Sequence, residues 1–576
     1  MRTKWFDSVS RSLPLNEYPR PQFARSSWLN LNGQWDYRIR KTSAPDDPSW
    51  DGKILVPFCP ESELSGVSRV LQPDETLIYR RYFSVPEDWK DSSVILHFGA
   101  VDYLCTVSLN GTDVGSHRGG YIPFSFDITG LLAEENELIV SVTDPTDKGL
   151  QQRGKQRLSP SGIFYTPLSG IWQTVWLEPV PVDHFTDVLI VPDIDSSTVS
   201  VTLMSKEDCR YKLTLSDRSG GILVQSAFRT NTEAVVSVSD PHLWTPEDPY
   251  LYSLRFESGS DIVTSYFGMR KFSVAEENGH PVFALNNKPY FMFGPLDQGY
   301  WPESNLTPPT EEAMVFDLAT MKSLGFNTLR KHIKTEPLRW YYLCDRIGMI
   351  VWQDMVSGGK CRTDISAIAR DQLGIKVPDD TEASYRRTGR SDPGNRKEYE
   401  DELRGLLGLL KNCVSLAVWV PFNECWGQFD ANRITDIIRG IDASRLIDQA
   451  SGWVDQGGGD FKSLHTYYKK LHEPKKADPR IFIISECGGF GFREDGHTWS
   501  DKTFSYGKLK THEELMTKYE SFVENELLPL RKKGLSAVIY TQLSDVETEL
   551  NGLLTYDRQT CKFDSEKLSI INRKTY

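Results

Sequence analysis

The sequence has no long apolar run. No stretch of about 18 consecutive apolar residues, the length that spans a membrane, occurs in it. The first residues, MRTKWFDSVSRSLPLNEYPRP, also lack the apolar core of a signal peptide. We therefore predict no membrane partner and no cleaved export signal, and we expect a cytoplasmic protein.

Cysteine is scarce and forms no motif. Nine cysteines are scattered from Cys59 to Cys561, without a C-x-x-C pair and without the spacing of metal ligands. An odd number of cysteines fits free thiols in a reducing compartment, which supports the cytoplasmic assignment. We predict neither a cofactor nor a bound metal ion.

Clustered positive charge is missing as well. The formal net charge is −13, and the basic run KKLHEPKK at Lys469–Lys476 is short. Nucleic-acid binding needs clustered Lys and Arg side chains against the phosphates, so we predict no nucleic-acid partner. Aromatic residues, in contrast, make up 11% of the chain. Two explanations of these rings stay open, sugar-binding clefts and the large cores of a β-rich protein.

Two consecutive segments predict β-sandwiches. From Trp28 to Val180, short stretches such as NELIVSVTD alternate with period two, and Asn110-Gly111 marks a hairpin between two of them. The same pattern continues to Val274, with enough strands for a smaller sandwich of immunoglobulin type. We predict a first β-sandwich over 1–180 and a second over 181–274.

The remaining residues, 275–576, predict a (β/α)8 barrel. Near-continuous apolar strands alternate here with amphipathic helices, which is typical of a parallel sheet. The segment TEEAMVFDLATMKSLG, for example, offers Thr310 as an N-cap and Gly325 just past the helix end. A number of strands close to eight in about 300 residues indicates the barrel.

Polar side chains end several of these apolar strands. The strand-end residues are Arg330, Asp354, Glu424, His465, Glu486 and Gln542. In a barrel of parallel strands the active site lies at the C-terminal edge of the strands. We therefore expect these side chains to meet around one pocket.

Glu424 and Glu486 are the candidate reactive groups. Each ends an apolar strand, WVPFNE or IFIISE, and the interval between them leaves room for two βα units, so we place them on strands four and seven. Two carboxyl groups about 5 to 5.5 Å apart are what retaining glycoside hydrolysis requires. Each Glu alone is equally explained as a salt-bridged residue at the rim. The presence of both, beside Asn423 and Arg330, favours the catalytic interpretation.

The chain resembles glycoside hydrolase family 2, the family of β-galactosidases, β-glucuronidases and β-mannosidases, over nearly its full length. WLNLNGQWDY and SGIWQTVWLE are similar to the family's sugar-binding domain, and LWTPEDPYLYSL is similar to its immunoglobulin-like domain. FNTLRKHIKTEPLRWYYLCDRIGMIVWQDM, VPFNECWGQFD, LHTYY and ISECGGFG resemble the core signatures of its barrel. The resemblance implies a jelly-roll sugar-binding domain, an immunoglobulin-like domain and a catalytic TIM barrel.

The resemblance also implies roles for single residues. Glu424 matches the general acid/base and Glu486 the nucleophile, and Asn423 matches the amide that hydrogen-bonds the sugar 2-hydroxyl. The predicted substrate-binding set is Asn423, Arg330, His332, His465, Tyr467, Asp354 and Gln542. Within it, Arg330 and Tyr467 resemble the partners of the nucleophile. For each His, a packed imidazole at a strand end is the alternative.

The predicted function is that of a retaining exo-β-glycosidase on small or oligosaccharide β-glycosides, with β-galactosides first. A β-glucuronidase or transglycosidase on the same site is an alternative. So is a non-catalytic carbohydrate-binding protein on a degenerate scaffold, which would have lost one Glu. A homo-oligomer stays open.

Charge near strand eight decides our order of substrates. A glucuronide carboxylate needs a cation, and the segment after Asn551 has Arg558 and Lys562 but not the Asn-x-Lys motif of the resembling β-glucuronidases. The match at Asn572-Arg573-Lys574 lies at the C-terminus, where we expect fraying.

Two smaller predictions complete the set. Asp545, Glu547 and Glu549 are expected to form a solvated acidic loop after strand eight. Side chains alternate along a strand, so Cys425 and Cys487, which follow the two glutamates, should point toward the surrounding helices.

Overall fold

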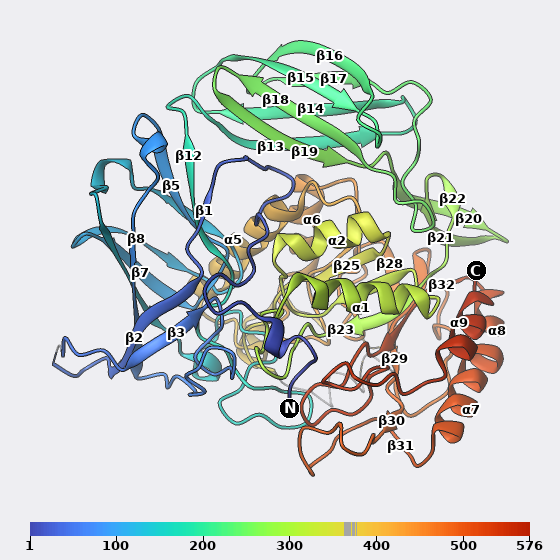
Figure 1. Ribbon diagram of the computed structural model, residues 1–576. Coiled ribbons are helices and arrows are strands. Elements are labelled where there is room, and N and C mark those ends of the chain that lie inside the picture. Colours follow the sequence, from blue (N-terminus) through green and yellow to red (C-terminus); the bar gives the residue numbers. More distant parts are fainter. Residues whose placement is uncertain (46, 362–369, 371–374, 376) are drawn as a thin grey trace.

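The computed structural model describes residues 1–45, 47–361, 370, 375 and 377–576, and it has two β-sandwiches packed against a barrel (Figure 1). The first sandwich is drawn in blue, the second in green at the top, and the barrel in yellow to red. The expected fold class is confirmed.

The first sandwich is antiparallel, with one sheet in the order β3-β2-β4-β10-β7-β8 and a second in the order β1-β12-β5-β9. Alternation builds its core: Leu138, Val140 and Val142 of β10 are buried and the residues between them are partly exposed. Asn110 and Gly111 have positive φ and join β7 to β8, as the hairpin prediction requires. The strands are β1 (Leu29–Asn30), β2 (Gly33–Lys41), β3 (Gly52–Val56), β4 (Glu75–Phe83), β5 (Ser93–Phe98), β6 (Val101–Asp102), β7 (Leu104–Leu109), β8 (Thr112–Arg118), β9 (Phe124–Asp127), β10 (Asn136–Thr143), β11 (Gly170–Ile171) and β12 (Val175–Val180).

The second sandwich has a sheet in the order β13-β14-β17 against one in the order β16-β15-β18-β19. A small antiparallel sheet, β20-β21-β22, follows it, and the predicted boundary after residue 274 falls within β20. The strands are β13 (Phe185–Asp193), β14 (Thr198–Ser205), β15 (Arg210–Ser216), β16 (Ile222–Arg229), β17 (Glu233–Ser237), β18 (Tyr252–Ser258), β19 (Asp261–Phe267), β20 (Phe272–Glu277), β21 (His280–Leu285) and β22 (Lys288–Pro289).

The barrel has eight strands in the order β27-β26-β25-β24-β23-β32-β29-β28, and all neighbours pair in parallel. Among the described residues no ladder joins β27 to β28, so the barrel is nearly closed. In chain order β26 is the fourth strand and β29 the seventh, as predicted for the two glutamates. The strands are β23 (Met292–Asp297), β24 (Thr328–Lys331), β25 (Ile350–Asp354), β26 (Leu416–Val420), β27 (Leu446–Ile447), β28 (Phe461–Thr466), β29 (Ile481–Gly488) and β32 (Leu535–Thr541), with β30 (Gly491–Phe492) and β31 (Lys508–Leu509) outside the barrel.

Helices cover the barrel less regularly than predicted. The Thr310 side chain accepts a hydrogen bond from Ala313 N, so it is the expected N-cap. The connections over 448–460 and 467–480 contain no helix. The first of them includes three consecutive glycines, which disfavour a helix. The helices are α1 (Glu311–Ser323), α2 (Leu338–Ile347), α4 (Glu382–Thr388), α5 (Pro393–Leu410), α6 (Ala431–Ile441), α7 (His512–Phe522), α8 (Leu528–Arg531) and α9 (Ser565–Arg573).

The loop after β32 is buried, so the prediction of a solvated acidic loop is wrong. Asp545, Glu547 and Glu549 are each at most 4% exposed. Lys562 Nζ lies 2.6 Å from Asp545. The backbone N–H of Thr166, in the first sandwich, donates to Glu547 at 2.7 Å. These donors satisfy the acids, so the loop joins two domains.

The C-terminus is ordered, so the prediction of fraying is also wrong. Asn572 is fully buried in α9, and its Nδ2 donates to Leu324 O at 2.7 Å. Tyr519 Oη donates to Asn572 Oδ1 at 2.8 Å. The side chain of Lys574 pairs with Glu524. These contacts fix the segment on the barrel surface.

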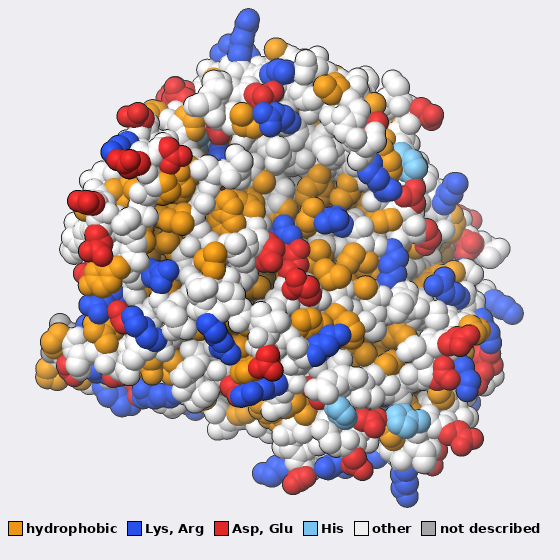
Figure 2. Space-filling model, viewed as in Figure 1, with side chains coloured by type: hydrophobic (Ala, Val, Ile, Leu, Met, Phe, Trp, Pro, Cys, Tyr) orange, Lys and Arg blue, Asp and Glu red, His pale blue; other side chains and the backbone are white. Residues whose placement is uncertain are grey.

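The visible surface carries charges of both signs, and apolar side chains gather across its middle (Figure 2). In the described part of the chain, no helix is both long and apolar enough to cross a membrane.

Candidate active site

Two acidic side chains meet at the C-terminal edge of the barrel. Glu486 lies on β29, which holds it directly. Glu424 lies in the loop after β26, with φ of 50°, and its backbone N–H donates to Ser451 O at 2.9 Å. The strand was expected to end in Glu424 itself. A short loop pinned to the strand-five connection holds this residue instead.

The distance between the two acids limits the chemistry. A carboxylate oxygen of Glu424, one of Glu486 and a ring nitrogen of His465 all lie within 4.8 Å of one another. Carboxyl groups about 5 to 5.5 Å apart are typical of retaining glycosidases, whereas inverting enzymes need about 6.5 to 9.5 Å to fit a water molecule. The observed spacing fits direct attack by one acid.

Arg330 organises the site from behind. Its side chain is fully buried and forms two bonds to Asp354, at 2.9 and 3.0 Å. It also donates to Glu486 Oε1 at 3.2 Å and to Asn423 Oδ1 at 2.8 Å. One planar guanidinium therefore fixes both an acid and the amide next to Glu424.

Glu486 is held as a carboxylate. Burial alone would raise its pKa. The charges of His465 and Arg330 and a hydrogen bond from Tyr467 Oη at 2.7 Å outweigh burial and lower the pKa below its usual value. Glu486 is therefore ionised at neutral pH, as a nucleophile must be.

The two predicted histidines have different partners. His465 Nδ1 lies 2.8 Å from Glu424 Oε1, and its Nε2 lies 2.9 Å from Ser451 Oγ. His332 Nδ1 lies 2.8 Å from Asp354 Oδ2. Burial, and next the charge of Lys155, lowers the pKa of His332 well below its usual value. His332 is therefore neutral, with its proton on Nδ1 and a free acceptor at Nε2.

Most of the predicted site residues line one pocket. Glu424, Glu486, Asn423, His332 and Tyr467 lie in its wall.

Three predicted residues do not line the pocket. Arg330 and Asp354 lie behind its wall, and His332 and Glu486 transmit their effect. Gln542 is fully buried, and its Nε2 donates to Asn551 Oδ1 at 2.8 Å. Thr541, the residue before it, lines the pocket instead.

The sequence did not indicate several wall residues. These are Lys155, Ile163, Phe164, Leu296, Gln298, Ile333, Cys361, Trp426, Trp453, Tyr506, Thr541 and Glu549. Tyr506 stacks on Tyr467 at 3.9 Å between ring centroids. Glu549 accepts hydrogen bonds from Tyr165 Oη and from Asn551 Nδ2. The high aromatic content was the available signal for the rings, but it could not separate wall from core.

The same acids could in principle bind a cation. Within the described ranges, the set of His, Cys, Asp and Glu side chains close enough to hold a metal ion is Glu424, His465 and Glu486. Arg330 already places a positive charge 3.2 Å from Glu486, which disfavours a second cation. The arrangement fits acid–base and nucleophilic chemistry better.

The two cysteines beside the glutamates are buried. Cys487 is fully buried in the core shared with the barrel helices, as alternation along β29 predicted, and burial raises its thiol pKa. Cys425 packs against Val377 and Val454. Its φ is 54°, so strand alternation does not apply there, and its neighbours belong to loops rather than to helices.

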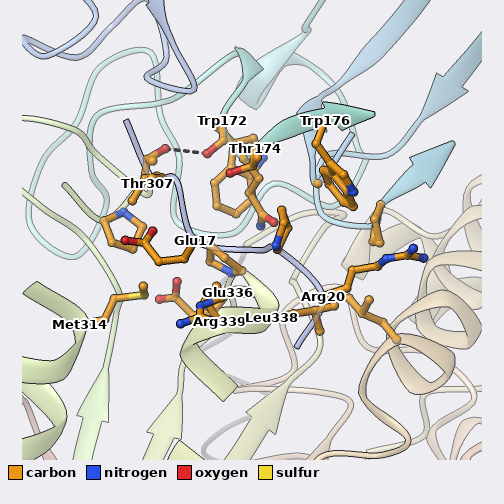
Figure 3. A pocket seen from close by; sticks show the side chains of 18 of the residues that line it. Glu17, Arg20, Trp172, Thr174, Trp176, Thr307, Met314, Glu336, Leu338 and Arg339 are labelled. Carbon is orange, nitrogen blue, oxygen red and sulfur yellow. Dashed lines mark hydrogen bonds between the residues drawn. The ribbon is translucent and has the colours of Figure 1, made fainter. Parts of the chain in front are cut away.

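A second cavity lies between the first sandwich and the barrel (Figure 3). Trp172 and Trp176 reach it from the sandwich, and Met314 and Leu338 reach it from α1 and α2. Its wall is mostly apolar and includes neither Glu424 nor Glu486. We interpret it as part of the contact between domains.

Three family models match the chain in order. A "Glycosyl hydrolase 2 galactose-binding domain-like" model matches residues 51–167, a "Glycosyl hydrolases family 2" model matches 183–270, and a "Glycosyl hydrolases family 2, TIM barrel domain" model matches 280–479.

Individual proteins are more distant. A β-galactosidase of Halalkalibacterium halodurans is 25% identical over 76% of this chain and 40% of its own length. The chain thus spans about two fifths of the length of curated relatives that it matches. The solved β-glucuronidase of an uncultured Clostridium sp. covers 96% of this chain, with 99% of its own chain aligned, TM-score 0.75 and 18% identity. For β-D-glucuronidase of Dictyoglomus thermophilum the values are 97%, 98%, 0.76 and 19%. At such identity these structures support the fold alone.

Proposed function

Because the chain belongs to glycoside hydrolase family 2, we propose that it is a retaining exo-β-glycosidase that cleaves terminal β-linked sugars. The observation that carries the proposal is the close pair Glu424 and Glu486, with Glu486 ionised by its partners. A non-catalytic sugar-binding protein would have no need of this pair.

Two displacements at the anomeric carbon make up the reaction. In the first, a Glu486 oxygen bonds to the anomeric carbon while Glu424 gives its proton to the leaving oxygen, and the bond between that carbon and oxygen breaks. In the second, Glu424 takes a proton from water, the water oxygen bonds to the same carbon, and Glu486 leaves as a carboxylate. Two inversions give net retention.

The shape of the pocket supports exo cleavage. Ile163 and Phe164 of the first sandwich, Trp426 of the strand-four loop and Trp453 of the strand-five loop form walls around the acids. Phe164 and Trp426 pack edge to face with centroids 5.8 Å apart. A pocket walled by two domains takes the end of a glycan rather than its middle.

The predicted preference for β-galactosides has support from the charges near strand eight. Arg558 is buried, lies 3.2 Å from Asp317 and donates to a backbone carbonyl, so it does not reach the pocket. Lys562 and Lys574 are held in the ion pairs described above. The match to β-galactosidases points the same way. One observation favours the alternative, a β-uronide: a different lysine lies in the pocket wall.

Rescue by azide tests the two roles. Glu486→Gly should abolish turnover, and added azide should then give a glycosyl azide of inverted configuration. Glu424→Ala should still form the covalent intermediate from substrates with good leaving groups, and azide should give a product of retained configuration. Wild type with azide is the control. Exchanged stereochemistry would reverse the two roles, and an unaltered rate in both variants would refute the proposal.

A further inference from the structure

Lys155 places a positive charge in the wall of the reactive pocket, and the acids around it are bonded to other groups. Glu486 is paired with Arg330, Glu424 with His465, and Glu549 with Tyr165. Among the described residues no ion pair within 4.0 Å and no hydrogen bond is found for the Lys155 ammonium; its recorded contact is with the ring of Tyr165, at 5.6 Å.

The backbone around Lys155 is fixed to the barrel. The backbone N–H groups of Arg153 and Gly154 both donate to Ser357 O, at 3.1 and 3.0 Å. Gly154 has φ of 61°, and a Cβ there would lie 2.9 Å from Ile333 O, so a side chain does not fit. Lys155 O accepts from Tyr165 N at 3.0 Å. The loop thus presents Lys155 in one place.

That place is beside the predicted sugar contacts. Lys155 and His332 line the same pocket, and the charge of Lys155 acts on His332 more strongly than the charge of Arg330 does. A half-buried ammonium without a counter-ion costs free energy, which an anionic ligand would recover. The remaining cations of the site, Arg330 and the histidines, are already bonded to acids or to Ser451.

We propose that Lys155 binds the carboxylate of a terminal uronic acid, so that the pocket takes β-uronides in preference to neutral β-hexosides. This rests on the proposed function and revises the order of substrates predicted from the sequence. That order considered cations after strand eight, whereas Lys155 comes from the first sandwich. Uronides differ from hexosides in having a carboxylate at C6, so the two classes can be compared with the stereochemistry held constant.

Matched substrates test the proposal. The rates kcat/KM are measured for 4-nitrophenyl β-glucuronide against β-glucoside, and for β-galacturonide against β-galactoside. In wild type at least one uronide should exceed its neutral partner. Lys155→Met should lower that ratio by about 10- to 100-fold, the range for a lost hydrogen bond to a charged group. Lys155→Arg should keep most of it. Because each ratio is taken within one variant, a general loss of activity cancels.

A neighbouring lysine provides the matched control. Lys148 is exposed, lies in the same connection and does not line the pocket, so Lys148→Met should leave the ratio at the wild-type value. Neutral glycosides that exceed both uronides in wild type, or a ratio that Lys155→Met does not lower, would overturn the proposal. So would a galactoside 6-sulfate that exceeds the galacturonide and depends on Lys155, since the anion would then be a sulfate. Absence of cleavage of every glycoside would instead refute the proposed function.

Discussion

The hydroxyl of Tyr467 offers a direct test of how Glu486 is kept ionised. It donates to Glu486 Oε2 at 2.7 Å and lies 2.8 Å from Thr541 Oγ1. Tyr467→Phe removes the hydroxyl and keeps the ring that stacks on Tyr506. The substitution therefore isolates one hydrogen bond to the proposed nucleophile.

The size of the effect follows from the charge on Glu486. A hydrogen bond to a charged group contributes about 1.5 to 3 kcal/mol. Its loss should lower kcat/KM by about 10- to 150-fold and raise the pKa of Glu486 by about 1 to 2 units. The carboxylate form is required for attack, so the acidic limb of the kcat/KM profile should move to higher pH.

The assay is the pH profile of kcat/KM with one chromogenic glycoside, and Tyr468→Phe is the matched control. Tyr468 is the next residue, is 72% exposed and touches Tyr506 only edge-on, with ring centroids 5.5 Å apart. An acidic limb that stays in place in Tyr467→Phe, or one that moves equally in both variants, would show that this hydroxyl does not hold Glu486 ionised.

Two further predictions concern buried groups outside this bond. Burial raises the pKa of Glu402 from 4.5 to about 8, so the folded protein keeps this proton and loses stability as pH rises between these values; Glu402→Gln should raise Tm at pH 9 and leave it unchanged at pH 5, and equal shifts at both pH values would contradict this. The fully buried Cys487, whose thiol pKa is raised by burial, should react with thiol reagents far more slowly than the half-buried Cys209, and rapid, substrate-protected alkylation of Cys487 would place it in the site instead.

Patterns with a strict period could be predicted from the sequence. Glu486 lies on the seventh strand because apolar residues precede it without interruption, and strand geometry then sends Cys487 into the helical layer. The N-cap at Thr310 follows from one side chain and its own neighbours. Such features depend on residues close in sequence, so the order of amino acids contains them.

Features that depend on another domain could not be predicted. Glu549 reads as a residue of an exposed acidic loop until Tyr165, from the first sandwich, bonds to it. Glu424 reads as a strand end, but its backbone is left-handed because the loop bonds to Ser451. Lys155 has no local pattern at all, and only the packing of sandwich on barrel brings it to the acids.

The attachment of residues 153 and 154 to Ser357 has a consequence for protein engineering. Part of the wall around the acids belongs to the first sandwich, so a mutant library restricted to the barrel would leave Lys155 and Phe164 unchanged. Exchanging the N-terminal segment between homologues would transfer that part of the wall as a unit. Selection for a new substrate should therefore yield substitutions in the first 180 residues as well as beside Glu424 and Glu486.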